Sequence, residues 1–125
     1  MISFDLFTIE EGSPIYLQIL LFIKRGIVSG RILDGDELPS RRVLSSLLGI
    51  NPNTVQKAFR MLEEEGLIES RSGVKSVIVV NSETVERVRA ELMKSDIRSV
   101  INALKQSGIT KEEAMRLIAQ NWEVM

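Results

Sequence analysis

The side chains with the clearest chemical potential are amides and a hydroxyl clustered near the middle of the chain. They are Asn51, Asn53, Thr54 and Gln56. Asparagine and glutamine amides make paired hydrogen bonds to the edge of adenine in the major groove of DNA. Such side chains reach base edges when they project from the N-terminal end of a helix that enters the groove. This spacing therefore predicts hydrogen bonding to DNA bases, with a partly A·T half-site.

Basic side chains accompany this polar cluster, although the whole chain carries a formal net charge of −1. Residues 38–62 include no acidic side chain but four basic ones, which are Arg41, Arg42, Lys57 and Arg60. Residues 70–82 add Arg71 and Lys75, again without an acid. A local basic surface favours phosphate contact whatever the total charge. For Arg60, which lies deeper in the predicted helix, we expect an ordinary surface position or an ion pair with Glu63 or Glu64 instead.

The composition argues against catalysis, metal binding and secretion. The chain of 125 residues has no cysteine and no histidine. It therefore lacks thiolate chemistry, the usual general base and the commonest transition-metal ligand. No paired carboxylates stand out, so we expect neither enzyme activity nor a cofactor. No apolar run is long enough to span a membrane, and the N-terminus lacks a signal-peptide pattern, so a cytoplasmic protein is expected.

Two predicted helices position the polar cluster. Ser40 is expected to cap a short helix that ends near Gly49, and Asn51 to cap the next, with Pro52 at its first position. Capping and base contact by Asn51 are compatible. The predicted core faces are Val43, Leu44, Leu47 and Leu48 in the first helix, and Val55, Ala58, Phe59 and Leu62 in the second. Two such helices joined through a glycine turn predict a helix-turn-helix.

The flanking segments predict the rest of an N-terminal domain over residues 1–80. Residues 1–12 are expected to form an arm, followed by a helix from Pro14 to about Ser29 that Ser13 caps. Glu37-Leu38 is expected to be a short edge strand. Strands at Ile68–Ser70 and Ser76–Val80, joined by a tight turn at Gly73, predict a wing hairpin. The predicted fold class is mainly α with a small β-hairpin, a winged helix-turn-helix.

Residues 81–125 are predicted to form a two-helix hairpin. Ser82 is expected to cap a helix to about Gln106, and Thr110 with Glu113 forms a capping box for the last helix. Both helices carry apolar stripes, which are Met93, Ile97, Val100, Ile101 and Leu104 in the first, and Met115, Ile118 and Trp122 in the second. So short a hairpin cannot bury both stripes by itself. We expect it to pack on the first helix, on a second chain as a dimer, or on both; a small-molecule effector pocket is the alternative.

Residues 13–80 resemble the winged-helix domain of GntR-family transcription regulators. The resemblance rests on the strings PIYLQI, SGRI and ELPSRRVLSSLLGINPNTVQKAFRMLEEEGLIESRSG. The short chain, the string NPNTVQKA and only two C-terminal helices are similar to the YtrA subfamily. Members of that subfamily are bacterial homodimeric repressors, often encoded beside ABC-transporter genes. The resemblance therefore implies a homodimeric repressor that binds a pseudo-palindromic double-stranded DNA operator.

The resemblance also implies individual DNA contacts. Arg42 occupies the arginine position of the family's PS-x-R element, and Ser40 its small residue near the DNA backbone. Asn51, Asn53, Thr54 and Gln56 fall on the contact positions of the recognition helix, and Lys57 follows as a phosphate neighbour. Arg41 has no counterpart in the family pattern, and from their positions alone Arg41 and Arg71 are expected to be phosphate contacts or ordinary surface residues.

The wing tip follows the family pattern only in part. Gly73 matches the first glycine of the family's G-x-G-T-F-V, but Lys75 replaces the second glycine and Val77 the aromatic residue. We therefore expect Lys75 to contact a phosphate, so that the wing positions the protein without reading sequence.

Two other functional classes stay open. In the first, the protein is a small-molecule sensor whose ligand binds at the C-terminal helices. In the second, the winged helix serves only as a protein-interaction module. The second class predicts an apolar or acidic recognition face, which the acid-free stretch over residues 38–62 disfavours.

Overall fold

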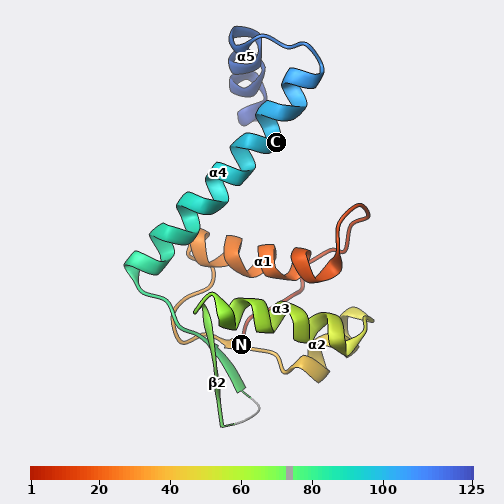
Figure 1. The fold of residues 1–125 in the computed structure, drawn as a ribbon, viewed down its shortest axis with the longest axis vertical. Coiled ribbons are helices and arrows are strands. Elements are labelled where there is room, and N and C mark those ends of the chain that lie inside the picture. The colour runs from red at the N-terminus through yellow and green to blue at the C-terminus, as the bar shows by residue number, and fades with distance from the viewer. Residues whose placement is uncertain (73–74) are drawn as a thin grey trace. The chain divides into compact units, whose positions relative to one another are not determined.

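The computed structural model describes residues 1–72 and 75–125. In the N-terminal part of the chain, helices pack together with a small sheet (Figure 1). The chain forms two compact units, Met1–Val88 and Arg89–Met125. The elements, in chain order, are α1 (Ile15–Ser29), β1 (Glu37–Leu38), α2 (Arg41–Leu48), α3 (Pro52–Glu64), β2 (Ile68–Arg71), β3 (Lys75–Ile78), α4 (Ser82–Gln106) and α5 (Lys111–Trp122). The first unit is the predicted winged helix-turn-helix.

The sheet is antiparallel, with the strand order β1-β3-β2. Leu38 pairs with Ser76, and Ile68 pairs with Ile78, which confirms the predicted edge strand and hairpin. β3 ends before the predicted Val80 because the Val80 N–H donates to Asp34 Oδ1 at 2.9 Å and so leaves the ladder. The predicted turn residue Gly73 lies outside the described residues.

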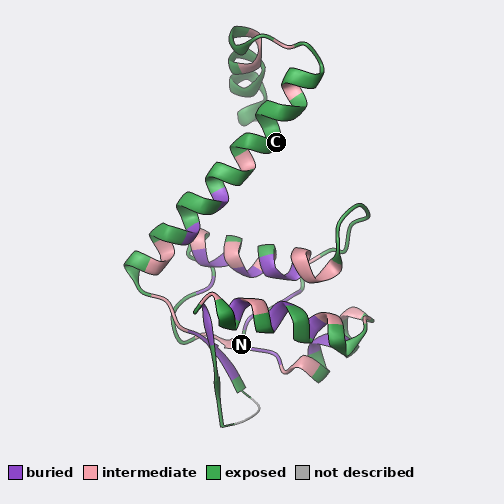
Figure 2. Cartoon of the chain, viewed as in Figure 1, coloured by how far each residue is buried: buried purple, intermediate pink, exposed green. Residues whose placement is uncertain are grey.

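The core of the first unit lies between α1 and α3. The predicted α3 face of Val55, Ala58, Phe59 and Leu62 is fully buried. Ile19, Ile23 and Ile27 of α1 pack against it at helical spacing, and Figure 2 shows the buried sides of the two helices turned toward each other. Each of these side chains except the smaller Ala58 contributes about 1.5–3 kcal/mol through burial. This core fixes the orientation of α3.

The N-terminal residues are not a free arm, so that expectation is wrong in part. Ile2 and Phe4 are 8% and 4% exposed and belong to the core. The Ile2 N–H donates to the Glu37 carbonyl of β1 at 2.8 Å. Phe4 also lies 5.0 Å from Phe22 of α1 between ring centroids. Alternating apolar residues at positions 2 and 4 place both side chains on one face of an extended segment, and burial of that face orders it.

Two helix caps differ from the predicted ones. Pro14, not Ser13, is the N-cap of α1, and Pro14 has no side-chain cap hydrogen bond. The loop before α1 is closed by Gln18, whose Nε2 donates to the Ser13 and Glu10 carbonyls at 3.0 and 2.8 Å. At the start of α4, Asn81 Oδ1 rather than Ser82 accepts the Thr84 N–H at 2.9 Å. Asn81 replaces Ser82 because a side-chain cap requires only an acceptor two or three residues before a free N–H, whereas at α1 the Leu17 and Gln18 N–H groups donate to the Pro14 backbone carbonyl.

The predicted inner face of α2 is only half correct. Leu44 is fully buried, and Leu48 is partly buried against the core. Val43 and Leu47, however, are 55% and 63% exposed. Val43 and Leu47 are one turn apart, so they lie on the same side of α2. That side is adjacent to the side of α2 that faces α3. Because α2 spans only eight residues, it turns one narrow stripe into the core.

The C-terminal unit consists of the later turns of α4 together with α5. The Thr110 side chain caps α5 by accepting the Glu113 N–H at 3.2 Å, as predicted. The apolar stripes on both helices stay largely open to solvent. The exposed members are Met93, Ile97, Val100, Ile101, Met115, Ile118 and Trp122. Contacts within this unit therefore do not cover the stripes.

Candidate nucleic-acid interface

The polar cluster lies at the N-terminal end of α3. The Asn51 side-chain oxygen accepts the Asn53 backbone N–H at 2.8 Å, which confirms the predicted cap. Pro52 follows at the first helical position, where its missing N–H leaves no hydrogen bond unmade. Asn53 and Gln56, three positions apart, are exposed, whereas Thr54 is half-buried. The amides of Asn53 and Gln56 are therefore accessible to an external partner, whereas the Asn51 oxygen already accepts a hydrogen bond within the helix.

A tight turn at Gly49 sets α2 against α3. Gly49 has a φ of 67°, a left-handed conformation that glycine adopts without steric cost. Its N–H donates to the Ser46 carbonyl at 3.3 Å. At the other end of α2, Ser40 Oγ accepts the Val43 N–H at 3.1 Å, as predicted for a cap. Arg42 is exposed on the first turn, so its guanidinium lies at the same end of α2 as the Ser40 hydroxyl.

Arg41 is not an ordinary surface residue. It is half-buried, and its guanidinium carbon lies 5.2 Å from the centroid of the Phe59 ring. Its Nε is buried, and no described residue forms a hydrogen bond with it. A cation over an aromatic face is attracted by the ring's quadrupole. Arg41 thus joins α2 to α3, and its contact with a phosphate stays a prediction.

Lys57 contacts α1 through an aromatic ring. Its Nζ lies 4.0 Å from the centroid of Tyr16, at the start of α1. Lys57 itself is exposed. Its side chain is therefore held at the side of α3 that faces the beginning of α1, with its ammonium still open to solvent.

The remaining basic residues pair with carboxylates. Arg60 Nε lies 3.9 Å from Glu64 Oε1, which confirms its expected ion pair. In the wing, Arg71 Nε lies 3.6 Å from Glu69 Oε1, and Lys75 Nζ lies 3.8 Å from Glu37 Oε1. These are exposed pairs of the kind that contributes about 0.2–1 kcal/mol. An approaching phosphate can compete for such cations.

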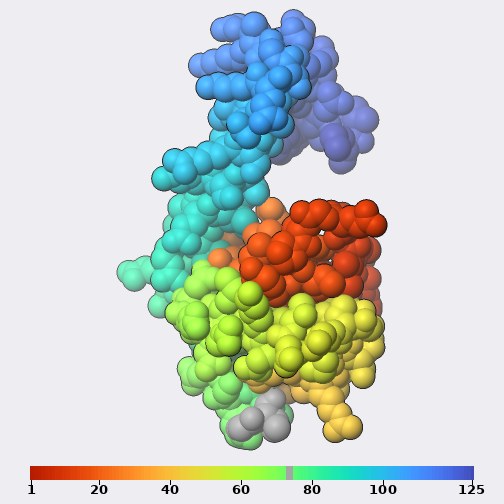
Figure 3. Space-filling view, turned by 45° about the vertical axis from the view of Figure 1, so that its right-hand side comes forward, coloured from red at the N-terminus to blue at the C-terminus, as the bar shows by residue number. Residues whose placement is uncertain are grey.

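The wing places two like charges side by side. Arg71 of β2 and Lys75 of β3 are directly paired in the sheet register. Like charges opposite each other destabilise a sheet, and Glu69 and Glu37 offset part of that cost here. Together with residues 40–60, which form a continuous yellow to light green surface in Figure 3, the wing completes a surface suited to a polyanion.

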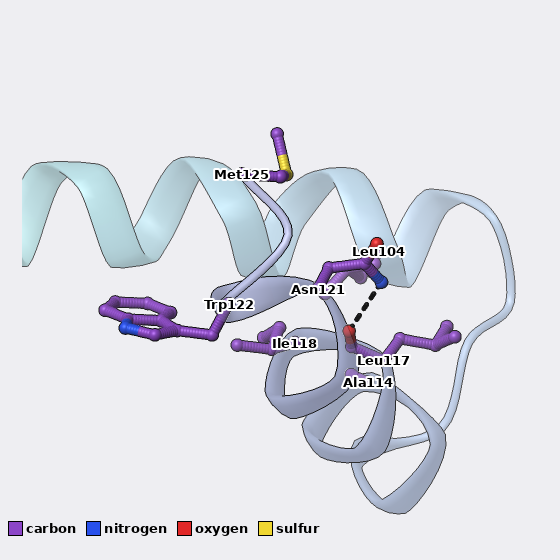
Figure 4. Close-up of a pocket in the computed structure, with 7 residues that line it drawn as sticks. All are labelled: Leu104, Ala114, Leu117, Ile118, Asn121, Trp122 and Met125. Atoms are coloured by element: carbon purple, nitrogen blue, oxygen red, sulfur yellow. Dashed lines mark hydrogen bonds between the residues drawn. The ribbon is translucent and has the colours of Figure 1, made fainter.

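The C-terminal unit has an open apolar groove between α4 and α5. It encloses about 640 Å³ and is lined by Leu104, Ala114, Leu117, Ile118, Asn121, Trp122 and Met125 (Figure 4). Asn121 Nδ2 donates to the Leu117 carbonyl at 2.8 Å, so this polar group is already satisfied. Ligand pockets need polar groups that orient the ligand. The groove instead offers an apolar surface, with Trp122 74% exposed.

Two further properties of the described residues bear on function. Their aspartate and glutamate side chains form no group of three or more able to hold a metal ion. Within the same residues, no helix combines the length and the apolar character that crossing a membrane requires.

Comparison with known proteins identifies the family. The sequence profile described as "Bacterial regulatory proteins, gntR family" matches residues 15–78. The chain belongs to the GntR family. It is 34% identical to the HTH-type transcriptional repressor YtrA of Bacillus subtilis, over 83% of this chain and 81% of that protein. It is 33% identical to the uncharacterised regulator YhcF of the same organism, over 85% and 88%. Family membership makes this chain a DNA-binding transcriptional regulator and not an enzyme.

Solved structures support the same fold for this GntR-family regulator. A GntR family transcriptional regulator from Listeria monocytogenes superposes with a TM-score of 0.78 at 29% identity, covering 90% of this chain and 98% of that one. YtrA from Sulfolobus acidocaldarius gives a TM-score of 0.54 at 32% identity, covering 99% and 98%. The resemblance to short, YtrA-like members of the family is thereby confirmed.

Sequence reasoning missed two residues that shape the interface of this regulator. Tyr16 lies beside the apolar stripe of α1, and an aromatic residue just off such a stripe was the available signal for its contact with Lys57. The contact of Glu65 was not predicted either: its Oε1 accepts a hydrogen bond from Lys24 Nζ at 2.7 Å. That ion pair is largely buried on the lysine side and ties α3 to α1.

Proposed function

We propose that this GntR-family regulator is a homodimeric repressor that binds a pseudo-palindromic operator through α2, α3 and the wing. The observation that supports the DNA contact most directly is the exposed, acid-free surface at the N-terminal ends of α2 and α3. Asn53 and Gln56 project from it, and Arg42 lies at the start of the neighbouring helix. This is the arrangement by which a helix-turn-helix reads the major groove.

The proposed contacts divide into two chemical classes. Asn53, Thr54, Gln56 and Arg42 contact base edges, because their side chains make directional hydrogen bonds that differ between bases. Asn51 contributes its amide N–H₂ group alone, since its oxygen caps α3. Phosphate contacts fix the register of the protein on the duplex. They come from Ser40, Arg41, Lys57, Arg71 and Lys75, with Gly73 at the wing tip.

The C-terminal unit is proposed as the dimerisation region, residues 81–125, following the DNA-binding region 1–80. Its exposed stripes would be covered by the same stripes of a second copy, because monomeric proteins rarely expose apolar patches of this kind. The contacting side chains are Met93, Ile97, Val100, Ile101, Leu104, Met115, Ile118 and Trp122. A dimer presents two recognition helices to half-sites whose centres lie about 34 Å apart, one turn of DNA.

Repression is the finer part of the proposal. It is supported by the similarity to YtrA of Bacillus subtilis, which is named a transcriptional repressor. A dimer bound over a promoter blocks access of the polymerase by steric exclusion. By the same resemblance, the regulated genes include a transporter operon, and the protein acts on chromosomal DNA in the cytoplasm.

Footprinting tests this proposal directly. Genomic fragments captured by the purified protein at near-physiological salt are labelled and probed with a nuclease. We expect two protected half-sites related by dyad symmetry, overlapping a promoter. Capture of fragments without any shared protected sequence would contradict operator binding. Protection of a single half-site by a protein that stays monomeric at micromolar concentration would contradict the dimer.

A further inference from the structure

Lys57 differs from Arg60, Arg71 and Lys75 in what it contacts. Arg60, Arg71 and Lys75 each lie within 3.9 Å of a carboxylate oxygen. Lys57 instead has its Nζ 4.0 Å from the centroid of the Tyr16 ring, and within the described residues no carboxylate pairs with it. The aromatic face attracts the ammonium without neutralising its charge. Lys57 therefore keeps its full charge for an external anion.

Tyr16 is itself held firmly. It is the second residue of α1, half-buried and packed against the core of the first unit. α1 and α3 lie side by side, and their N-terminal ends point to the same side of the unit (Figure 1). The ring is thus a fixed surface beside the recognition helix, whereas the lysine stem has rotatable bonds along its length.

We propose that Tyr16 is a positioning residue that holds Lys57 in place for a phosphate contact. A flexible lysine loses rotamer freedom when it binds a phosphate, and that loss weakens the contact. Tyr16 restricts the side chain before DNA arrives, so less freedom is lost on binding. This inference rests on the proposed DNA-binding function and adds to it a residue from α1, outside the helix-turn-helix and wing.

The test compares Tyr16→Leu, which removes the ring but keeps an apolar side chain, with Tyr16→Phe, which keeps the ring. Binding to an operator duplex and to an unrelated duplex is measured at several salt concentrations, beside Lys57→Gln and the double variant Tyr16→Leu/Lys57→Gln. We expect Tyr16→Leu to weaken both duplexes by roughly twofold to fivefold. The salt slope should fall by up to about 0.9, the contribution of one phosphate contact. Tyr16→Phe should retain the wild-type slope.

The salt slope separates positioning from simple destabilisation. A variant that only unfolds more easily has a smaller active fraction, which lowers apparent affinity but leaves the slope unchanged. Thermal melting of each variant measures that fraction. In the Lys57→Gln background, Tyr16→Leu should change nothing further. A wild-type slope in Tyr16→Leu, or an equal loss of slope with Lys57 already removed, would overturn the inference.

Failure of this inference and failure of the proposed function give different results. If the wild-type chain binds operator and Lys57→Gln keeps the wild-type slope, Lys57 makes no phosphate contact and only the role of Tyr16 is lost. If the wild-type chain prefers no duplex, the proposed operator binding fails, and the inference fails with it.

Discussion

At the scale of single residues, the amide side chains at the start of α3 have different roles although they share the same chemistry. Asn51 commits its oxygen to the Asn53 N–H at 2.8 Å, whereas Asn53 and Gln56 are exposed. The residue types and their spacing were sufficient to predict this cluster and the cap. They could not predict that Arg41 lies over Phe59 and Lys57 over Tyr16, because those contacts depend on how α2 and α1 pack on α3.

Removing a base-reading side chain should reduce specificity. Arg42→Ala and Gln56→Ala are each expected to cost about 1–3 kcal/mol of operator binding and to relax the preference at one base pair. Fluorescence anisotropy on the operator and on its single-base variants measures both effects. Arg60→Ala is the matched control, since Arg60 pairs with Glu64 and should leave the preference intact. Equal weakening on operator and random DNA would contradict base contact.

Asn51 should contribute to folding stability independently of DNA. Asn51→Ala removes the acceptor for the Asn53 N–H and is expected to lower the free energy of unfolding by about 0.5–2 kcal/mol. Asn51→Ser retains an acceptor and should lose much less. Urea denaturation without DNA measures both variants. An unchanged midpoint for Asn51→Ala would show that the cap is unimportant.

At the scale of elements, the spacing of apolar residues was sufficient to predict the buried residues of a helix that has one wide buried face. The core face of α3 was predicted because its four apolar positions recur at helical spacing. The same reasoning failed for Val43 and Leu47, because a helix as short as α2 meets the core along one narrow stripe. It also failed for Ile2 and Phe4, whose burial depends on the surface that α1 and β1 provide.

The close contact between the end of α1 and the following loop gives a stability prediction. A Cβ atom on Gly26 would lie 2.7 Å from Ile32 Cγ1, and the Ile32 N–H donates to the Gly26 carbonyl at 2.9 Å. Because Ile32 is itself buried, Gly26→Ala should destabilise the fold by about 1–3 kcal/mol through overpacking. The double variant Gly26→Ala/Ile32→Val should recover part of that loss in thermal unfolding. Wild-type stability in the single variant would refute the close packing.

At the scale of the whole molecule, the apolar stripes of α4 and α5 could be predicted, but the partner that covers them could not. The exposed positions include Ile101 and Trp122. The arrangement of two copies depends on contacts between chains, which hydrophobic periodicity within one chain does not encode. Half-site spacing in the operator depends on the same contacts.

A charge placed in a stripe should separate the proposed dimer. Ile101→Glu would bury an unpaired carboxylate in the interface and is expected to weaken association by about 3 kcal/mol or more. Asn102→Glu introduces the same charge at the neighbouring exposed position and should leave association unchanged. Sedimentation equilibrium measures both variants. A wild-type dissociation constant for Ile101→Glu would place the dimer interface elsewhere.

The most direct test of the central claim is selection of bound duplexes from a random double-stranded library at near-physiological salt. We expect enrichment of an inverted repeat whose half-sites are centred about 34 Å apart or a multiple of that spacing. Enrichment of no sequence, with binding that disappears as salt rises, would mean that only phosphate charge is recognised. That result would contradict sequence-specific operator binding.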